Sequence, residues 1–213
     1  MGKGPSYSLP LRRRREGRTD YRLRKALVVS NLPRLVVRKS LNGFSVQLVE
    51  AKLNGDQVVV SANSKELKKK YGWKACGGSI SAAYLTGLLC GLKALTKNVK
   101  NAVLDIGLHS PTKGAAVFAA LKGALDAGIE ISHSEEKLPN ESRIKGEHIA
   151  KYAKQLSVNS ESYQKQFSDY IKQNFSPENI EKHFDEIKTK ILVAFEAKPR
   201  APKKKKKKEE KSD

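Results

Sequence analysis

The most constraining feature of the sequence is a stretch of 18 residues, Ser79 to Thr96, that is apolar around almost the whole circumference of a helix. Such a helix must be buried on nearly every side, so it predicts a core in which one helix is enclosed by other elements. Its longest apolar run, Ile80 to Leu92, is 13 residues long and ends at Lys93, which is too short for a membrane span. The pair Gly87 and Gly91 predicts close packing of this helix against a sheet.

Three β-rich segments before this helix predict that sheet. They cover Arg34 to Lys39, Phe44 to Lys52 and Asp56 to Asn63, and the turn dipeptides Asn42-Gly43 and Asn54-Gly55 join them into an antiparallel meander. Apolar and polar residues alternate in the first two segments. One face of the sheet can therefore be buried under a helix, while the other face stays partly polar.

A second pattern predicts parallel strands. A buried-type strand, Asn101 to Ile106, is followed by an Ala-rich helix, Gly114 to Ala127, and by a short strand, Ile129 to Ser132. This order is that of a βαβ unit, in which the two strands run parallel. The fold class is therefore α/β, with a mixed sheet that combines the antiparallel meander and the parallel βαβ strands.

Helices are expected on both sides of this α/β core in the sequence. Near the N-terminus, Thr19 or Asp20 can cap a helix over Tyr21 to Ser30. After Leu138-Pro139 the pattern is helical throughout, which predicts a helical C-terminal extension. The three helices expected there cover Lys145 to Leu156, Ser160 to Asn174 and Pro177 to Glu196.

The positive charge of the chain is large and unevenly distributed. The sequence has 42 Lys and Arg against 22 Asp and Glu, which gives a net charge of +20. Residues 1–104 hold 21 basic and 5 acidic side chains, whereas residues 105–198 hold 13 and 14. A free monomer with so much positive charge repels itself, which indicates a polyanionic partner.

The two ends of the chain have the most biased composition. Residues 1–18 contain six basic side chains and one acidic side chain, with little apolar surface to bury, so we expect a basic arm that a partner must order. Residues 199–213 contain six consecutive lysines, Lys203 to Lys208, and we expect a disordered, lysine-rich tail. Between them we expect an α/β RNA-binding core over residues 19–156 and a helical extension over residues 157–198.

Sequence motifs for catalysis are incomplete. The segment from Gly107 to Gly114 lacks the spacing of a Walker A loop, although the helix start that follows, with Lys113 beside it, could bind one phosphate. A metal-dependent nuclease would need several converging carboxylates, and the strands offer only Glu50, Asp56 and Asp105. We therefore expect no enzyme, no metal and no cofactor.

The cysteines and histidines do not form a recognisable disulfide or metal-binding motif either. Cys76 and Cys90 are 14 positions apart and fit neither a disulfide framework nor a zinc site, and the four histidines lack the spacing of metal ligands. The sequence also begins without an apolar signal-peptide core. We expect a protein of a reducing, cytosolic compartment, with no membrane partner and no small-molecule substrate.

Nucleic-acid binding, by contrast, is supported by three basic clusters. Arginine dominates the first two, and its planar guanidinium contacts phosphate with two hydrogen bonds and stacks on unpaired bases. The third cluster combines lysines with Tyr71 and Trp73, and aromatic rings are the usual platforms on which bases stack. For Trp73, a place in the protein core is the alternative. The clusters comprise Arg12, Arg13, Arg14, Arg15 and Arg18, then Arg22, Arg24 and Lys25, and finally Lys68, Lys69, Lys70, Tyr71, Trp73 and Lys74.

Several segments, taken together and in this order, resemble one protein family. They are RRRREGRTDYRLRKAL, PRLVVRKS, SANSKELKKKYGWK, AAYLTGLLCGLKAL, VLDIGLHSPTKGAAVFAALKGALDAG and IKGEHIAKYAKQL. Over about residues 11–156 the sequence is similar to the archaeal-type large-subunit ribosomal protein eighteen, a family related to the eukaryotic large-subunit protein five.

The resemblance implies a non-catalytic 5S rRNA-binding protein of the central protuberance, in the cytoplasmic ribosome, with an α/β core of ribonuclease-H-like topology. The partners that it implies are 5S rRNA, the large-subunit rRNA and neighbouring ribosomal proteins. The residues that it assigns to 5S rRNA are Arg12 to Arg15, Arg18, Tyr21, Arg22, Arg24, Arg34, Arg38 and Lys39. Weaker candidates, which could instead meet the large rRNA or a neighbouring protein, are Tyr71 to Lys74 and Lys113.

Two other functions remain as alternatives. A free basic RNA chaperone or annealing protein would need only the arm and the tail, and it is disfavoured because basic residues also lie in the folded region. The metal-dependent nuclease is the alternative from the enzyme class. Addition of Mg²⁺ to the protein and a labelled RNA separates the nuclease from both binding functions.

Overall fold

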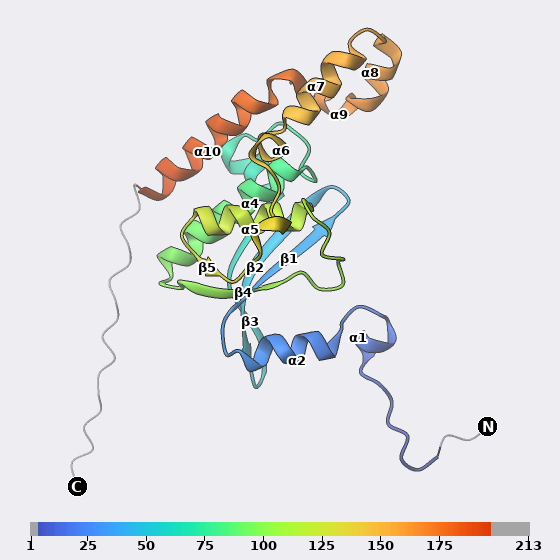
Figure 1. Cartoon of the computed structure of the whole chain (residues 1–213), viewed down its shortest axis with the longest axis vertical. Helices are drawn as coiled ribbons and strands as arrows, with labels where there is room; N and C mark the ends of the chain where they lie inside the picture. Colours follow the sequence, from blue (N-terminus) through green and yellow to red (C-terminus); the bar gives the residue numbers. More distant parts are fainter. Residues whose placement is uncertain (1–3, 197–213) are drawn as a thin grey trace.

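The computed structural model describes residues 4–196, and the lysine-rich tail expected over residues 199–213 lies outside the described residues. A five-stranded sheet lies between the N-terminal helices α1 and α2 and the C-terminal helices α7 to α10 (Figure 1). The elements in chain order are α1 (Arg12–Arg15), α2 (Tyr21–Val29), β1 (Arg34–Ser40), β2 (Gly43–Lys52), β3 (Gly55–Asn63), α3 (Ser64–Glu66), the π-helix η1 (Leu67–Tyr71), α4 (Ile80–Thr96), β4 (Asn101–Asp105), α5 (Ala116–Asp126), β5 (Glu130–Ile131), the 3₁₀ helix η2 (Glu135–Lys137), α6 (Glu141–Lys145), α7 (Glu147–Leu156), α8 (Ser160–Gln166), α9 (Ser168–Lys172), the 3₁₀ helix η3 (Pro177–Asn179) and α10 (Ile180–Glu196).

The sheet has the order β3-β2-β1-β4-β5. The first three strands form the antiparallel meander, and β4 runs parallel to both β1 and β5. Helix α5 connects β4 to β5, as the βαβ pattern predicted. The mixed α/β class is thus confirmed, and the strand order and directions are those of a ribonuclease-H-like sheet.

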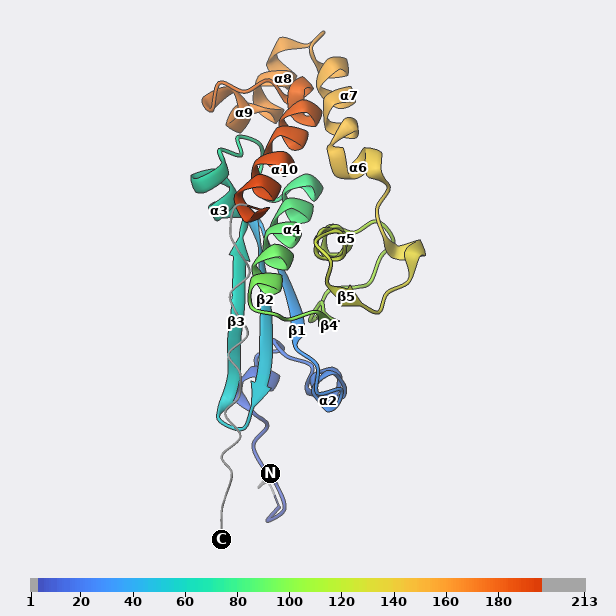
Figure 2. The same cartoon turned by 90° about the vertical axis from the view of Figure 1, so that its left-hand side faces the viewer.

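One face of the sheet belongs to the core. Leu35 and Val37 on β1, with Val46 and Leu48 on β2, have no exposed surface, as their alternation predicted. Helix α4 packs across β2 and β3 and covers this face (Figure 2). The opposite face carries the residues between them, such as Val36 and Gln47, and it faces α2.

Helices α4 and α5 approach each other at glycine contacts. A Cβ on Gly87 would lie 1.9 Å from the carbonyl oxygen of Ala120, and a Cβ on Gly123 would lie 2.1 Å from that of Tyr84. Gly91 faces Ala127 of the same partner segment. The expected packing of Gly87 and Gly91 against the sheet is therefore wrong, because both glycines face α5. No helix in the described part of the chain is long and apolar enough to cross a membrane.

The C-terminal segment is helical, as predicted, but its helices are shorter. Gly146, at a φ of +91°, separates α6 from α7, and the helix expected over Ser160 to Asn174 is divided at Phe167. Phe167 has a φ of −106° and a ψ of 24°, and its buried ring contacts those of Tyr163 and Tyr170. Pro177 begins a 3₁₀ turn that leads into α10.

Helix α10 packs on the core helix α4, where the ring centroids of Phe184 and Tyr84 are 5.5 Å apart. Its buried residues, which include Ile180 and Ile187, belong to the same apolar cluster as those of α4 and the sheet. The domain boundary at residue 156 stays a prediction.

At the N-terminal end of the molecule, none of the four arginines of α1 is buried.

We predict that Gly123→Ala destabilises the protein by about 1–3 kcal/mol, although alanine is the better helix former. The new methyl group would meet backbone atoms of α4, so the two helices would have to separate. The free energy of unfolding in a denaturant titration measures this effect. Lys122→Ala, at the neighbouring position of α5, is the matched control, and an equally small change in both variants would contradict the close approach.

Candidate nucleic-acid interface

A chain of five charged side chains crosses the outer face of the sheet. Asp105 Oδ2 accepts a hydrogen bond of 3.0 Å from Arg34 Nη1, and Asp56 Oδ2 accepts one of 2.8 Å from Arg34 Nη2. Asp56 Oδ1 accepts from Arg24 on α2 at 2.9 Å, and Asp105 Oδ1 accepts from Arg38 at 2.9 Å. The chain therefore connects α2, β3, β1 and β4 through alternating charges.

Arg34 is the centre of this chain and is only 3% exposed. A buried guanidinium is tolerated only where carboxylates pair with it, and here two carboxylates do so. The prediction that Arg34 contacts RNA is wrong for this conformation, because its guanidinium is engaged inside the protein. Asp105 and Asp56, the carboxylates considered for a nuclease, are engaged by the same arginines.

Arg38 is also held in place, but its side chain remains 45% exposed. Its Nη1 donates to the carbonyl oxygens of Val37 and Asp105, and its guanidinium lies against Gly107. Gly107 has a φ of +67°, and a Cβ there would approach the guanidinium to 2.9 Å. Arg38 therefore stays a candidate for RNA contact with a fixed orientation.

The helix α2 is fixed at its N-terminus by Asp20, as predicted. The Asp20 carboxylate accepts hydrogen bonds from the backbone N–H groups of Arg22 and Leu23. In the arm, Arg13 Nε donates to Thr19 Oγ1 at 2.8 Å, which folds the end of α1 back toward α2. Local hydrogen bonds thus orient both basic segments.

A cleft of about 710 Å³ separates the arm and α2 from the outer face of the sheet. It brings together five of the predicted residues from three segments of the chain, namely Arg13, Arg18, Arg24, Arg34 and Arg38. Its lining also includes Gln47 of β2, which the sequence analysis missed. The sequence could have revealed Gln47, because the tight turn at Asn42-Gly43 sets the register of β1 and β2. This register places Gln47 opposite Val36.

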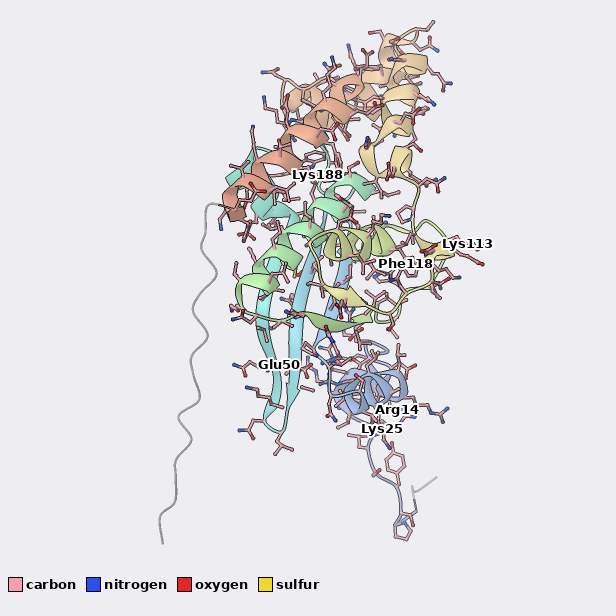
Figure 3. All side chains as sticks on the ribbon, turned by 60° about the vertical axis from the view of Figure 1, so that its left-hand side comes forward. Arg14, Lys25, Glu50, Lys113, Phe118 and Lys188 are labelled. Atoms are coloured by element: carbon pink, nitrogen blue, oxygen red, sulfur yellow. The ribbon has the colours of Figure 1, made fainter. Side chains whose placement is uncertain are left out.

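Other predicted cations are exposed around this end of the molecule. Figure 3 shows Arg14 and Lys25 at the end formed by α1 and α2, apart from Lys188 of α10. Among the described residues, no hydrogen bond or ion pair engages the side chains of Arg14, Arg15, Arg22, Lys25 and Lys39. Tyr21 lines a neighbouring shallow surface, and Arg12 and Arg18 pair with Glu16. These cations are available to an external anion.

The third cluster lies elsewhere. Lys68, Lys69 and Lys70 belong to η1, which follows α3 at the same end of the molecule as α9 and α10 (Figure 2). Burial alone would raise the pKa of Glu66, but hydrogen bonds from Lys70 and Lys93 lower it overall. The exposed lysines here form a second basic surface, separate from the cleft.

Trp73, the aromatic centre of that cluster, is a core residue with 2% of its surface exposed. Its ring stacks on His183 of α10, with centroids 5.1 Å apart and planes 16° apart. The prediction that Trp73 stacks on a base is therefore wrong, and the alternative, a place in the core, is confirmed. Tyr71 is half-buried beside it, whereas the Lys74 side chain is exposed.

The predicted anion site before α5 is not assembled. The N–H of Gly114 donates to the carbonyl oxygen of Lys137, and Lys113 pairs with Glu136 at 3.3 Å. Helix α5 itself begins two residues later, with no side-chain cap. Figure 3 shows Lys113 apart from Arg14 and Lys25, and it stays a weak candidate.

Within residues 4–196, no group of three or more His, Cys, Asp and Glu side chains is arranged to hold a metal ion. Of the two cysteines, Cys76 is exposed and Cys90 is buried in α4. Burial raises the pKa of the Cys90 thiol to about 12, which disfavours the nucleophilic thiolate.

We predict that Asp105→Asn lowers the free energy of unfolding by about 3 kcal/mol, because it leaves the buried Arg34 guanidinium with one carboxylate instead of two. The matched control is Asp169→Asn, which removes an exposed carboxylate 3.9 Å from Lys172 and should change stability by less than about 1 kcal/mol. Equal effects of the two substitutions in denaturant titrations would contradict the central role of Arg34.

We also predict that part of the pH dependence of stability comes from His183. Burial lowers the pKa of His183, and its Nε2 accepts a hydrogen bond of 3.1 Å from the Lys74 N–H, which only the neutral ring can do. Because the folded-state pKa lies below the unfolded value of about 6.5, this stability is complete above that value and is lost as pH falls toward the folded pKa. His183→Gln keeps an acceptor but cannot titrate, so its unfolding free energy should fall less steeply between about pH 7 and pH 5. A slope equal to that of the wild type would refute this assignment.

Comparisons with known proteins relate the chain to proteins of the large ribosomal subunit. The family model described as "Ribosomal large subunit proteins 60S L5, and 50S L18" matches residues 6–103 and 97–134. The large ribosomal subunit protein uL18 of Aeropyrum pernix is 54% identical over 196 residues, which cover 92% of each chain. The protein of the same name from Desulfurococcus amylolyticus is 52% identical over 195 residues, which cover 92% of this chain and 99% of the relative. The chain therefore belongs to the family of ribosomal large-subunit proteins that comprises 60S L5 and 50S L18.

Proposed function

We propose that this structural protein of the large ribosomal subunit binds 5S rRNA through the α1–α2 end and helps to attach it to the large-subunit rRNA in the central protuberance. The single observation that carries the proposal is the cleft, which gathers arginines from the arm, α2 and β1 on the sheet face that α4 leaves uncovered. Arginine side chains suit this role because they bind phosphate and stack on unpaired bases. The proposal includes no catalytic step.

The proposed contacts divide into fixed and mobile groups. Arg24 and Arg38 are held by carboxylates, so they present a fixed spacing of positive charge to the RNA. Arg14, Arg15 and Arg22 have side chains that nothing in the described residues restrains, so they can adapt to the phosphate backbone. Fixed cations favour a particular RNA shape, whereas adaptable cations add affinity for any RNA.

The second basic surface, on η1, suits a different partner. Its exposed Lys68 and Lys69 lie beside the C-terminal helices, away from the cleft. We assign this surface to the large-subunit rRNA or to a neighbouring ribosomal protein. A protein with two separate surfaces can hold two partners together, which is what attachment of 5S rRNA requires.

A free RNA chaperone is the competing function. It would need mobile basic segments alone, because annealing relies on charge neutralisation without a fixed geometry. The buried Arg34 and its two carboxylates speak against it, since they keep Arg24 and Arg38 in fixed places. Specificity for 5S rRNA over unrelated RNA separates the two functions.

We predict that Arg14→Ala combined with Arg15→Ala flattens the plot of log affinity for 5S rRNA against log salt concentration by about one to two units. Each phosphate that a cation neutralises contributes about 0.7 to 0.9 to this slope. Because neither side chain has a partner among the described residues, the melting temperature should not change. Filter binding at several salt concentrations measures the slope.

The matched control for this experiment removes two charges at the other end of the molecule. Lys154→Ala combined with Lys165→Ala changes exposed residues of α7 and α8. The slope of this variant should equal that of the wild type. If both pairs flatten the slope equally, only net charge matters and the proposed location of the interface fails.

A further inference from the structure

We propose that the cleft between α2 and the sheet binds one unpaired nucleobase of the RNA, with the flanking phosphates on its arginine rim. The inference rests on the proposed function and specifies how the surface would recognise its RNA. It follows from three features of the cleft, namely an apolar floor, an amide without a partner and a basic rim.

The floor of the cleft is apolar, and part of it is open to solvent, since Val49 is only 5% exposed but Val58 is half-exposed. Val36, Val49 and Val58 come from three adjacent strands, and the register places Val49 opposite Val58. Leu23 of α2 forms part of the facing wall, and Val58 and Leu23 are 49% and 41% exposed. Removal of this apolar surface from water would be favourable, and a flat ring is the part of an RNA that can cover it.

Gln47 supplies a polar group in this apolar setting. Its half-buried side chain lines the cleft, opposite Val36 in the strand register. Among the described residues, its amide has no hydrogen-bond partner. An amide carries both donors and an acceptor, so it can pair with the edge of a base that is not paired with another base.

The rim carries the positive charge that a nucleotide needs. Arg13 and Arg18 come from the arm, and Arg24 and Arg38 come from α2 and β1. The acidic residues of the cleft are already engaged, since Asp56 and Asp105 pair with arginines and Asp20 accepts backbone hydrogen bonds. Five arginines and three aspartates line the cleft, so its net charge is positive even though Arg24 and Arg38 are paired, and this charge complements phosphate groups.

The size of the cleft favours a single nucleotide. Sites for small molecules usually have about 300–1,000 Å³, and the cleft has about 710 Å³. A duplex would be too wide to enter it, but a base turned out of a loop or bulge would fit, with its backbone along the rim. An acidic peptide would match the rim but would need its own apolar group for the floor, and this occupant is an outcome that the experiment can reveal.

The experiment compares Gln47→Leu with Gln57→Leu in the full chain bound to 5S rRNA. Both substitutions replace an amide by an apolar group of similar size, but Gln57 is exposed on β3 and lies outside the cleft. Base-edge modification by dimethyl sulfate and a carbodiimide identifies unpaired bases that the protein covers. The melting temperature of each variant reports folding.

We expect the wild type and Gln57→Leu to protect the same unpaired base. At saturating concentration, Gln47→Leu should leave this base reactive, and its affinity for 5S rRNA should be roughly tenfold lower with an unchanged salt slope. Val58→Trp, at an exposed position of the floor, fills the cleft and should have the same effect without loss of a polar group. The second variant keeps the test valid if Gln47→Leu lowers the melting temperature.

Two results would overturn the inference while the proposed function stands. One is specific 5S rRNA binding with identical footprints for the wild type and both cleft variants. The other is a footprint without any protected unpaired base, together with a crosslink from the cleft to another protein in assembled subunits, which would mark it as a peptide site. Equal affinity of the wild type for 5S rRNA and an unrelated RNA would instead overturn the proposed function itself, and the assignment of the base with it.

Discussion

The structure depends on the charge of one buried residue, Arg34. A guanidinium in this position requires two carboxylates, and the pairs with Asp56 and Asp105 connect β1 to the far strand of the meander and to the parallel strand β4. Breaking a buried pair by removing one partner usually costs about 3–5 kcal/mol, which is a large share of the stability of a domain. Because Asp56 also accepts from Arg24, the same requirement fixes the position of α2. The carboxylate that pairs with the buried Arg34 therefore also orients Arg24 of the basic surface.

The two faces of the sheet have complementary roles. On the inner face, the glycines of α4 and α5 allow backbone contact, so the core is thin and dense, and α10 closes it from outside. On the outer face, one ion pair, between Arg24 and Asp56, joins α2 to the sheet, and Val58 at the cleft stays half-exposed. A helix that packed through its apolar stripe would have closed this space. The ionic attachment holds α2 in place and keeps the cleft open.

The sequence predicted those features that local rules determine. Turn dipeptides and alternation placed the three strands of the meander, and the cap of α2, Asp20, is one of the two residues expected there. The sequence could not tell which partner a residue meets across the fold. Trp73 lies in a basic run and the family resemblance assigned Arg34 to RNA, yet both are buried against residues distant in sequence, namely His183 and Asp105. The direction of Gly87 also depends on Ala120 of α5, a neighbour that only tertiary packing supplies.

The distribution of cations then explains why the chain has so much charge in its first half. Arginines gather at the α1–α2 end, where carboxylates fix some and leave others free, whereas η1 presents lysines on a short π-helix beside α10. Lysine ammonium groups act as point charges and tolerate many geometries, but a planar guanidinium favours a specific arrangement of phosphates and bases. The first surface is thus suited to recognition and the second to attachment. Since the sheet separates the two surfaces, the two partners of the proposed function would contact different side chains.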